Sequence, residues 1–207
     1  AALSKALKTQ YGLPIADKYR IRIEPTENPK ESEVYLTLSS IGEVVSGATR
    51  VWQPREKDVE LETEMLLKLM VFLGNDKSDA ITKIQSNNNE NTVNITVVLS
   101  ETGYATLLFP FDKQESWKLL GWALDELNID IDDRDQIEGS YFINVTPNKG
   151  FFSKLLATAS ITKTYQLILK EDANSQTKVI FVDFEEEGNE KTISYSAELF
   201  EQIASKF

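Results

Sequence analysis

The sequence predicts an α+β fold of two related domains, each with an antiparallel sheet packed against a long helix. Three observations support this prediction. Apolar and polar residues alternate in pairs of segments that turn-forming residues separate, a pattern typical of β-hairpins. A segment with apolar residues at helical spacing follows each pair. This unit of strand, turn, strand and helix occurs twice, so the chain contains a diverged internal repeat.

The second copy of the repeat occupies residues 161–207 and is the clearer one. Alternating side chains predict a strand at 165–170, a polar run at 172–175 is typical of a turn, and an apolar strand resumes at 179–182. Apolar residues then recur at helical spacing and predict a C-terminal helix: Leu199, Phe200, Ile203 and Phe207.

The first copy has the same order of elements. Residues 19–24 match residues 165–170 position by position, and residues 32–36 match residues 177–181. A helix predicted at about 59–73 closes this copy, because its apolar residues mark one face: Leu61, Met65, Leu69 and Phe72, with Leu66 and Val71 at the edges.

Further elements precede the repeated unit in the second copy. These are strands at 93–99 and 104–109, a helix at 115–127 whose start Asp112 can cap, and a strand region at 129–145. The first copy has no counterpart of the strand at 104–109, the helix at 115–127 or the strand region at 129–145. We therefore expect the sequence to start inside the first domain, which then lacks its N-terminal strand and helix. Ordinary element lengths suggest roughly forty to fifty further residues upstream.

Residues 86–91 are the best boundary between the two domains. This run is short, polar and rich in asparagine, and it offers nothing to bury. The predicted organisation is the C-terminal part of a first domain at residues 1–85, a linker at 86–91 and a second domain at 92–207. A chain of 207 residues accommodates two modest domains.

Composition and charge exclude several classes of protein. Apolar residues make up 41% of the chain and aromatic residues 10%, which is enough to fill cores and argues against global disorder. The chain has 33 acidic and 22 basic residues, a net charge of −11, and its basic residues are scattered, so no nucleic-acid partner is expected. No apolar run approaches the length of a membrane helix, so any membrane attachment must come from outside residues 1–207.

Cysteine and histidine are both absent. This excludes disulfides, thiolate nucleophiles, zinc sites built from thiolate or imidazole, and catalysis with histidine as the general base. The acidic run at residues 130–135 suggests a calcium loop, but Asp135 stands where such a loop needs glycine and Tyr141 stands where it needs glutamate. The sequence therefore predicts neither a metal nor a cofactor.

Two short segments carry candidate interaction residues. Trp52, Pro54 and Arg55 lie in a segment that the first copy inserts before its helix, and tryptophan is over-represented in binding hot spots. The alternative is that Trp52 covers the core of its own domain. Phe151 and Phe152 are adjacent in a loop-like setting, where neighbouring bulky side chains point in different directions, so both an interaction surface and core packing stay open.

The chain resembles a known family most strongly in residues 117–142. There a tryptophan-bearing helix leads into Asp133-Arg134-Asp135 and then into Gly139-Ser140-Tyr141-Phe142. Residues 19–24, 51–55 and 62–74 also match. In these motifs the chain resembles the NlpB/DapX family, the BamC lipoproteins of the outer-membrane β-barrel assembly (BAM) complex.

The resemblance implies a fold and a cellular context. It implies two helix-grip domains joined by a linker, each with an antiparallel sheet wrapped against a long helix. It also implies an outer-membrane lipoprotein of a Gram-negative bacterium, with these domains in the periplasm or at the cell surface. Other BAM subunits are the implied partners, chiefly the BamD lipoprotein. The implied signal peptide, lipidated cysteine and BamD-binding segment would lie outside residues 1–207.

Three functions are compatible with the sequence. The leading hypothesis is a non-enzymatic scaffold subunit of the assembly complex. The alternative is a carrier of an apolar small molecule, which needs a cavity where a scaffold would be filled by the bulky Trp117, Phe181 and Phe200. An enzyme would need two converging carboxylates as acid and base, and solvated loops explain the candidate residues better; these are Asp133, Asp135, Glu185, Glu186 and Glu187.

Overall fold

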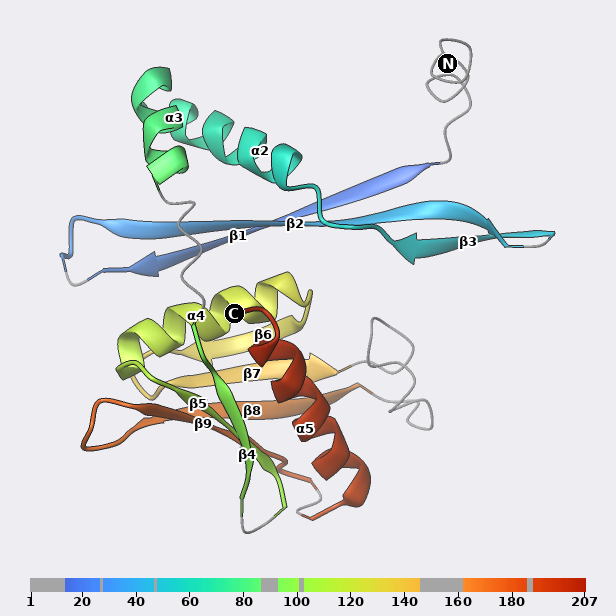
Figure 1. The fold of residues 1–207 in the computed structure, drawn as a ribbon, viewed down its shortest axis with the longest axis vertical. Coiled ribbons are helices and arrows are strands. Elements are labelled where there is room, and N and C mark those ends of the chain that lie inside the picture. Colours follow the sequence, from blue (N-terminus) through green and yellow to red (C-terminus); the bar gives the residue numbers. More distant parts are fainter. Residues whose placement is uncertain are drawn as a thin grey trace. The chain divides into compact units, whose positions relative to one another are not determined.

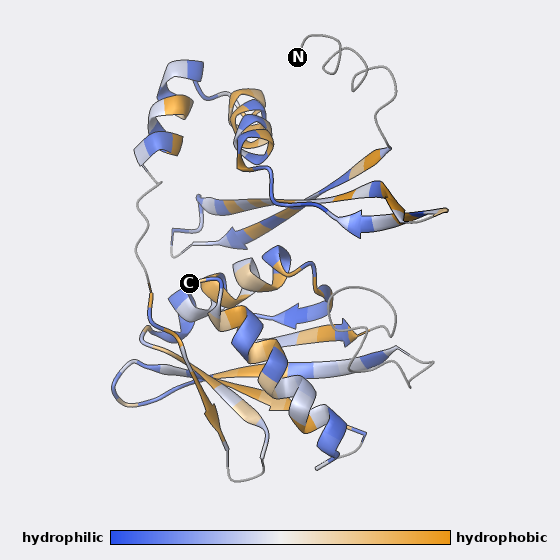
Figure 2. Cartoon of the chain, turned by 45° about the vertical axis from the view of Figure 1, so that its right-hand side comes forward, coloured by the Kyte–Doolittle hydropathy of each residue, from blue (hydrophilic) through white to orange (hydrophobic). Residues whose placement is uncertain are grey.

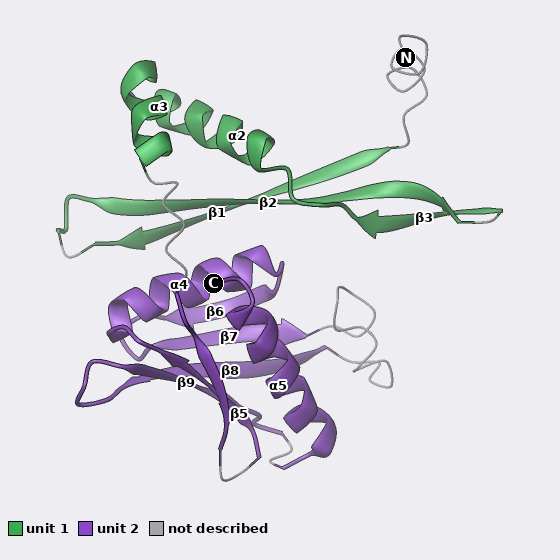
Figure 3. Cartoon of the chain, in the orientation of Figure 1, with its two compact units in different colours: residues 1–89 green, residues 90–207 purple. Residues whose placement is uncertain are grey.

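The chain has an α+β fold with two antiparallel sheets and four helices among the residues that the structure describes (Figure 1). The structure is a computed structural model, and it describes residues 14–26, 28–46, 48–86, 93–100, 103–145, 162–185 and 188–207. The chain divides into two compact units, unit 1 at residues 1–89 and unit 2 at residues 90–207 (Figure 3). The α+β class predicted from the sequence is confirmed, and the finer helix-grip description stays a prediction.

Unit 1 contains a three-stranded antiparallel sheet in the order β1-β2-β3. Its elements are β1 (Ile15–Pro25), β2 (Ser32–Ser46), β3 (Thr49–Pro54), α2 (Val59–Phe72) and α3 (Lys77–Ser86). The hairpin and the helix expected at 59–73 are both present. However, β2 is longer than expected, and the inserted segment pairs with it as β3.

The helix α2 begins at an N-cap and packs on β2. The Asp58 carboxylate accepts a hydrogen bond from the Leu61 backbone N–H at 3.0 Å, which satisfies one of the free donors of the first turn. Leu61 and Leu69 are half-buried, whereas Phe72 is 86% exposed. The apolar face of α2 is therefore covered unevenly, since the described part of unit 1 leaves Phe72 in the last turn exposed.

The two copies of the repeat differ in how far their first strands are covered. Ile21 and Ile23 pair with Leu36 and Val34, so they share the sheet face that α2 covers, yet they are 54% and 58% exposed. The matching side chains of unit 2, Leu167 and Leu169, are almost completely buried. In unit 2 a further helix packs on the equivalent strand.

Unit 2 is built on a six-stranded antiparallel sheet in the order β4-β5-β9-β8-β7-β6. The sequence order of its elements is β4 (Thr96–Leu99), β5 (Ala105–Phe109), α4 (Lys113–Glu126), β6 (Asp130–Asp135), β7 (Ser140–Val145), β8 (Lys163–Glu171), β9 (Thr177–Val182) and α5 (Glu190–Ala204). Every strand and helix expected in this part of the sequence is present. The strand region expected at 129–145 is the hairpin of β6 and β7.

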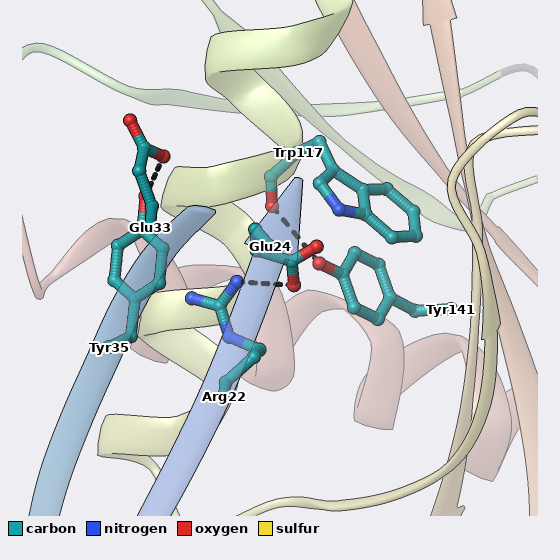
Figure 4. A network of polar contacts seen from close by, with 6 residues as sticks. All are labelled: Arg22, Glu24, Glu33, Tyr35, Trp117 and Tyr141. Atoms are coloured by element: carbon teal, nitrogen blue, oxygen red, sulfur yellow. Dashed lines mark hydrogen bonds and ion pairs between the residues drawn. The ribbon is translucent and has the colours of Figure 1, made fainter. Parts of the chain in front are cut away.

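The core of unit 2 lies between one face of this sheet and the two helices. Trp117 of α4 stacks on Tyr141 of β7 with ring centres 3.9 Å apart, and the Tyr141 hydroxyl donates a hydrogen bond to the Trp117 carbonyl at 3.1 Å (Figure 4). Phe181 of β9 and Phe200 of α5 meet edge to face. All four rings are at most 2% exposed, so they fill the space between sheet and helices. Figure 2 shows that α5 carries both apolar and polar residues around its circumference, as a helix on a sheet requires.

Candidate interaction surface

Trp52 lies on β3, the last strand of the unit 1 sheet, and half of its surface is exposed. It pairs with Glu43 of β2, and Pro54 pairs with Ile41. Because paired residues share a sheet face and alternate residues return to it, Trp52, Pro54 and Ile41 lie on the same side of the β2–β3 ribbon. The indole is therefore not enclosed in a core.

Val45 of β2 lies on this side of the ribbon as well, because it belongs to the same series of alternate residues as Ile41 and Glu43. Ile41 is 43% exposed and Val45 is 63% exposed. Between them, the Glu43 side chain forms an ion pair with that of Arg50 on β3, with a carboxylate oxygen 3.4 Å from a guanidinium nitrogen. We call the four residues Ile41, Val45, Trp52 and Pro54 the ribbon patch. Its exposed apolar side chains adjoin the Glu43–Arg50 ion pair.

Arg55 lies on the other side of the ribbon. Its backbone N–H donates a hydrogen bond to the Ser40 carbonyl at 2.9 Å. Gly42 faces away from the ribbon patch, because it alternates with Ile41 and Glu43. The Arg55 side chain packs over this glycine, since a Cβ atom added at Gly42 would lie 3.0 Å from the Arg55 Cδ. The structure thus brings Trp52 and Pro54 together and separates Arg55 from them.

The other candidate residues of the sequence, Phe151 and Phe152, lie outside the described residues. Ile41 and Val45 were not singled out from the sequence. The available signal was that Ile41 and Val45 share a side of β2, but this spacing identifies a surface only when the register with β3 is known.

A polar network lies on the same sheet face of unit 1, toward the β1–β2 turn (Figure 4). The Arg22 guanidinium is 2.8 Å from the Glu24 carboxylate, and it lies 4.2 Å from the centre of the Tyr35 ring. The Tyr35 hydroxyl donates to the Glu33 carboxylate at 3.0 Å. One face of the sheet therefore has an apolar end at the ribbon patch and an ionic end at this network.

Unit 1 also contains an apolar groove of about 430 Å³ between β2 and the two helices. Its walls are mainly aliphatic, and Glu62 and Lys83 supply charge. The residues that line its apolar part include Val34, Leu36, Leu66, Leu69, Met70 and Leu73. Such a lining suits an apolar ligand or an apolar side of a helix.

The acidic candidates of unit 2 serve local structure. The Asp133 carboxylate accepts a hydrogen bond from the Arg134 N–H at 2.8 Å, and the Asp135 carboxylate accepts one from the Glu138 N–H at 3.0 Å. The Glu185 carboxylate is 3.3 Å from the Lys163 amine. Within the described ranges, no three carboxylates come close enough together to hold a metal ion. Glu186 and Glu187 lie outside those ranges.

No helix in the described part of the chain has the length and apolar character needed to cross a membrane.

Comparison with known proteins gives consistent matches. The model of the family described as "Outer membrane protein assembly factor BamC-like C-terminal domain" matches residues 95–207. A protein named outer membrane protein assembly factor BamC from Accumulibacter regalis is 30% identical over 191 residues, which cover 84% of this chain and 50% of the relative. A protein of the same name from Thiobacillus denitrificans is 30% identical over 201 residues, which cover 91% of this chain and 51% of the relative.

A third protein named BamC, from Shewanella oneidensis, is 24% identical over 180 residues, covering 84% of this chain and 48% of the relative. The chain therefore spans about half the length of the curated relatives that it matches. The family match covers more than half of the chain and includes all the described strands and helices of unit 2 and none of those in unit 1. The chain belongs to the family of outer membrane protein assembly factor BamC-like proteins.

Proposed function

We propose that this chain belongs to an accessory subunit of the machinery that assembles outer membrane proteins, and that it acts by binding other proteins. The names of its relatives support the assembly role. The observation that carries the binding role is the ribbon patch, where Trp52, Val45 and Ile41 are about half exposed on one side of a two-stranded ribbon.

The chemistry of the ribbon patch suits a protein partner. A half-exposed tryptophan offers a large apolar surface that loses little side-chain entropy on binding, and such residues dominate binding energies at interfaces. The adjacent Glu43–Arg50 pair can orient a partner by exchanging hydrogen bonds at the rim. No step of this role requires a catalytic group.

Other subunits of the BAM complex are the proposed partners, and the BamD lipoprotein is the one that the family resemblance suggests. The same resemblance suggests a lipid anchor in the outer membrane. Because the chain contains no cysteine, a lipidated cysteine would lie outside residues 1–207. Both features are proposals for the whole protein, since the chain spans about half of its relatives.

Site-specific crosslinking tests the proposal. A photoreactive amino acid would replace Trp52 in the full-length protein in its native host, and the matched control would carry the same group at Gln53, which faces the opposite side of β3. We expect subunits of the assembly machinery among the products from position 52 and far less product from position 53. In the purified complex, Trp52→Ala should weaken binding about tenfold or more without changing the melting temperature.

Equal crosslinking from both positions, or unchanged binding by Trp52→Ala, would count against the ribbon patch. A second candidate function, carriage of an apolar small molecule, is favoured by the groove of about 430 Å³ in unit 1. Native mass spectrometry of the same purified protein would detect such a molecule. A stoichiometric apolar ligand, found without any assembly subunit, would replace the scaffold proposal with the carrier.

A further inference from the structure

The sheet of unit 2 has one face that carries neither α4 nor α5, and we call it the outer face. Along β9, Val179 and Phe181 point toward the helices and are buried, so Ile180 and Val182 point to the outer face. Ile180 is paired with Thr106 on one side and with Ile168 on the other. The outer face therefore has a continuous row of side chains across neighbouring strands.

The outer face carries apolar side chains beside polar ones, and its polar members on the central strands include Thr106, Ser140, Gln166, Lys170 and Lys178. We call the following residues the apolar band: Val98, Leu108, Phe142, Ile168, Ile180, Val182 and Phe184. Phe184 is 61% exposed, and its ring stacks on that of Phe142 with centres 6.5 Å apart. No member of the band belongs to the core cluster between sheet and helices or packs against it. Apolar side chains gathered on an open sheet face are typical of a surface that another element covers.

One border of the outer face is acidic. Asp130, Asp133 and Asp135 of β6 pair with Asn144, Phe142 and Ser140, which place their side chains on the outer face. Asp132 also lies on this side, because its carboxylate accepts a hydrogen bond from the Asn144 side-chain amide at 3.0 Å. We call these four aspartates the acidic border. It adjoins the apolar band directly, since Asp133 is the neighbour of Phe142.

We propose that the outer face of unit 2 binds an amphipathic helix of a partner protein, with the apolar side of the helix on the apolar band and its lysines or arginines over the acidic border. The inference rests on the proposed function only in taking the partners of this chain to be proteins. It concerns unit 2 alone and is separate from the ribbon patch.

The geometry of the face favours a helix as the occupant. The backbone groups of the inner strands are used in sheet pairing, so an occupant must bind through side chains, as α4 and α5 do on the inner face. The apolar band extends from β4 to β7 across five strands, which is about 19 Å at the usual spacing of strands. A helix of about 13 residues has this length.

The charge at the Phe142 end of the face favours a basic partner over a second copy of the chain, because the acidic border lies there, whereas Lys170 and Lys178 lie at the other end, near the β8–β9 turn. A second copy would carry the same acidic border and the same net charge of −11, so the two would repel each other. A helix with lysine or arginine beside its apolar side would be attracted to the border, and desolvated contacts with the band would then hold it. An anionic lipid surface would be repelled for the same reason as a second copy.

A designed peptide tests the inference on the full chain. The probe is a synthetic peptide of about 13 residues with leucines at helical spacing on one side and lysines directly beside them. Its control has the same composition in an order that places no leucines on a common side. We expect the probe to shift the amide NMR signals of outer-face residues on β5, β7, β8 and β9, and to bind more weakly as salt concentration rises. The control peptide should leave those signals unchanged.

Matched variants locate the binding surface. Phe184→Ser should weaken probe binding about tenfold, and Asp133→Asn should weaken it and reduce its salt dependence. Ile137→Ser is the control, because Ile137 is 88% exposed on the turn beside Lys113 at the start of α4, away from the outer face. It should bind the probe as the unchanged chain does.

Three results would overturn the inference. The first is equal binding of the two peptides, and the second is an equal loss of probe affinity in Phe184→Ser and Ile137→Ser. The third is a dimer in sedimentation experiments that Phe184→Ser dissociates, which would assign the face to a second copy. Trp52→Ala should not change probe binding. The proposal for the outer face and the proposal for the ribbon patch can therefore fail independently, and the experiments distinguish the two failures.

Discussion

Two tyrosines in the core of unit 2 make its stability sensitive to alkaline pH. The Tyr195 ring on α5 lies 5.6 Å from the ring of Tyr165 on β8, and both side chains are 1% exposed. Burial raises the pKa of Tyr195 and that of Tyr165, because a phenolate in the core would lose its hydration. In the unfolded chain both would ionise near pH 10. Their contribution to stability is therefore complete below about pH 10 and is lost as the pH rises toward the folded pKa.

We expect the free energy of unfolding to fall above about pH 10, by up to about 1.4 kcal/mol per pH unit for each tyrosine that stays protonated in the folded state. The Tyr195→Phe variant has no phenol to ionise at this position, so its stability should fall less steeply. Urea unfolding between pH 8 and pH 11, values that bracket the usual tyrosine pKa of about 10, measures both slopes. Parallel slopes for the two proteins would show that other groups cause the alkaline loss.

At the residue scale the sequence identified side chains but not the faces that they share. Trp52 and Pro54 stood out by residue type, and the structure puts them on one side of the ribbon. Arg55 is next to them in sequence but packs over Gly42 on the other side. Phe72 was placed on the apolar face of its helix by spacing, yet it is 86% exposed, because spacing shows which residues share a side and not how far a neighbour covers it.

The start of α4 depends on one carboxylate. Asp112 accepts a hydrogen bond from the Glu115 N–H at 2.8 Å, as the capping-box pattern in the sequence predicts. We expect Asp112→Ala to destabilise unit 2 by about 0.5–2 kcal/mol, because the N–H loses its partner. Asp112→Asn is the control, since asparagine caps about as well as aspartate. Chemical denaturation followed by circular dichroism measures the difference, and equal losses in both variants would point to the charge of Asp112 and not to the cap.

At the element scale the sequence predicted hairpins and helices whose signals are local. The β8–β9 hairpin, α4 and α5 all have turn residues, caps or apolar periodicity within a few residues. The strand β3 was not predicted, although it forms a hairpin with the adjacent end of β2, because Thr49–Pro54 lacks a regular alternation of apolar and polar residues. The helix α3 was also missed, since among its ten residues only Ala80 is buried and its apolar pattern is weak.

The two units differ in how much apolar surface they bury, so we expect them to differ in stability. Among the described residues of unit 1, the buried apolar side chains are Leu36, Leu38 and Ala80. Unit 2 has a continuous core that joins the sheet to α4 and α5. Burial of apolar surface is the main favourable term in folding, and regions with few buried contacts open first.

The whole chain should therefore unfold in two steps rather than one. We expect backbone amides of β1, β2 and β3 to exchange with deuterium before those of β8 and β9. Residues 90–207 should fold alone, and their melting temperature should equal that of the second step of the whole chain. Leu124→Ala should lower the free energy of unfolding of the second step alone, by about 2–5 kcal/mol, because Leu124 is fully buried in unit 2. Leu36→Ala is the matched variant in unit 1 and should change only the first step. A single transition that both variants shift equally would show instead that the two units fold as one cooperative body.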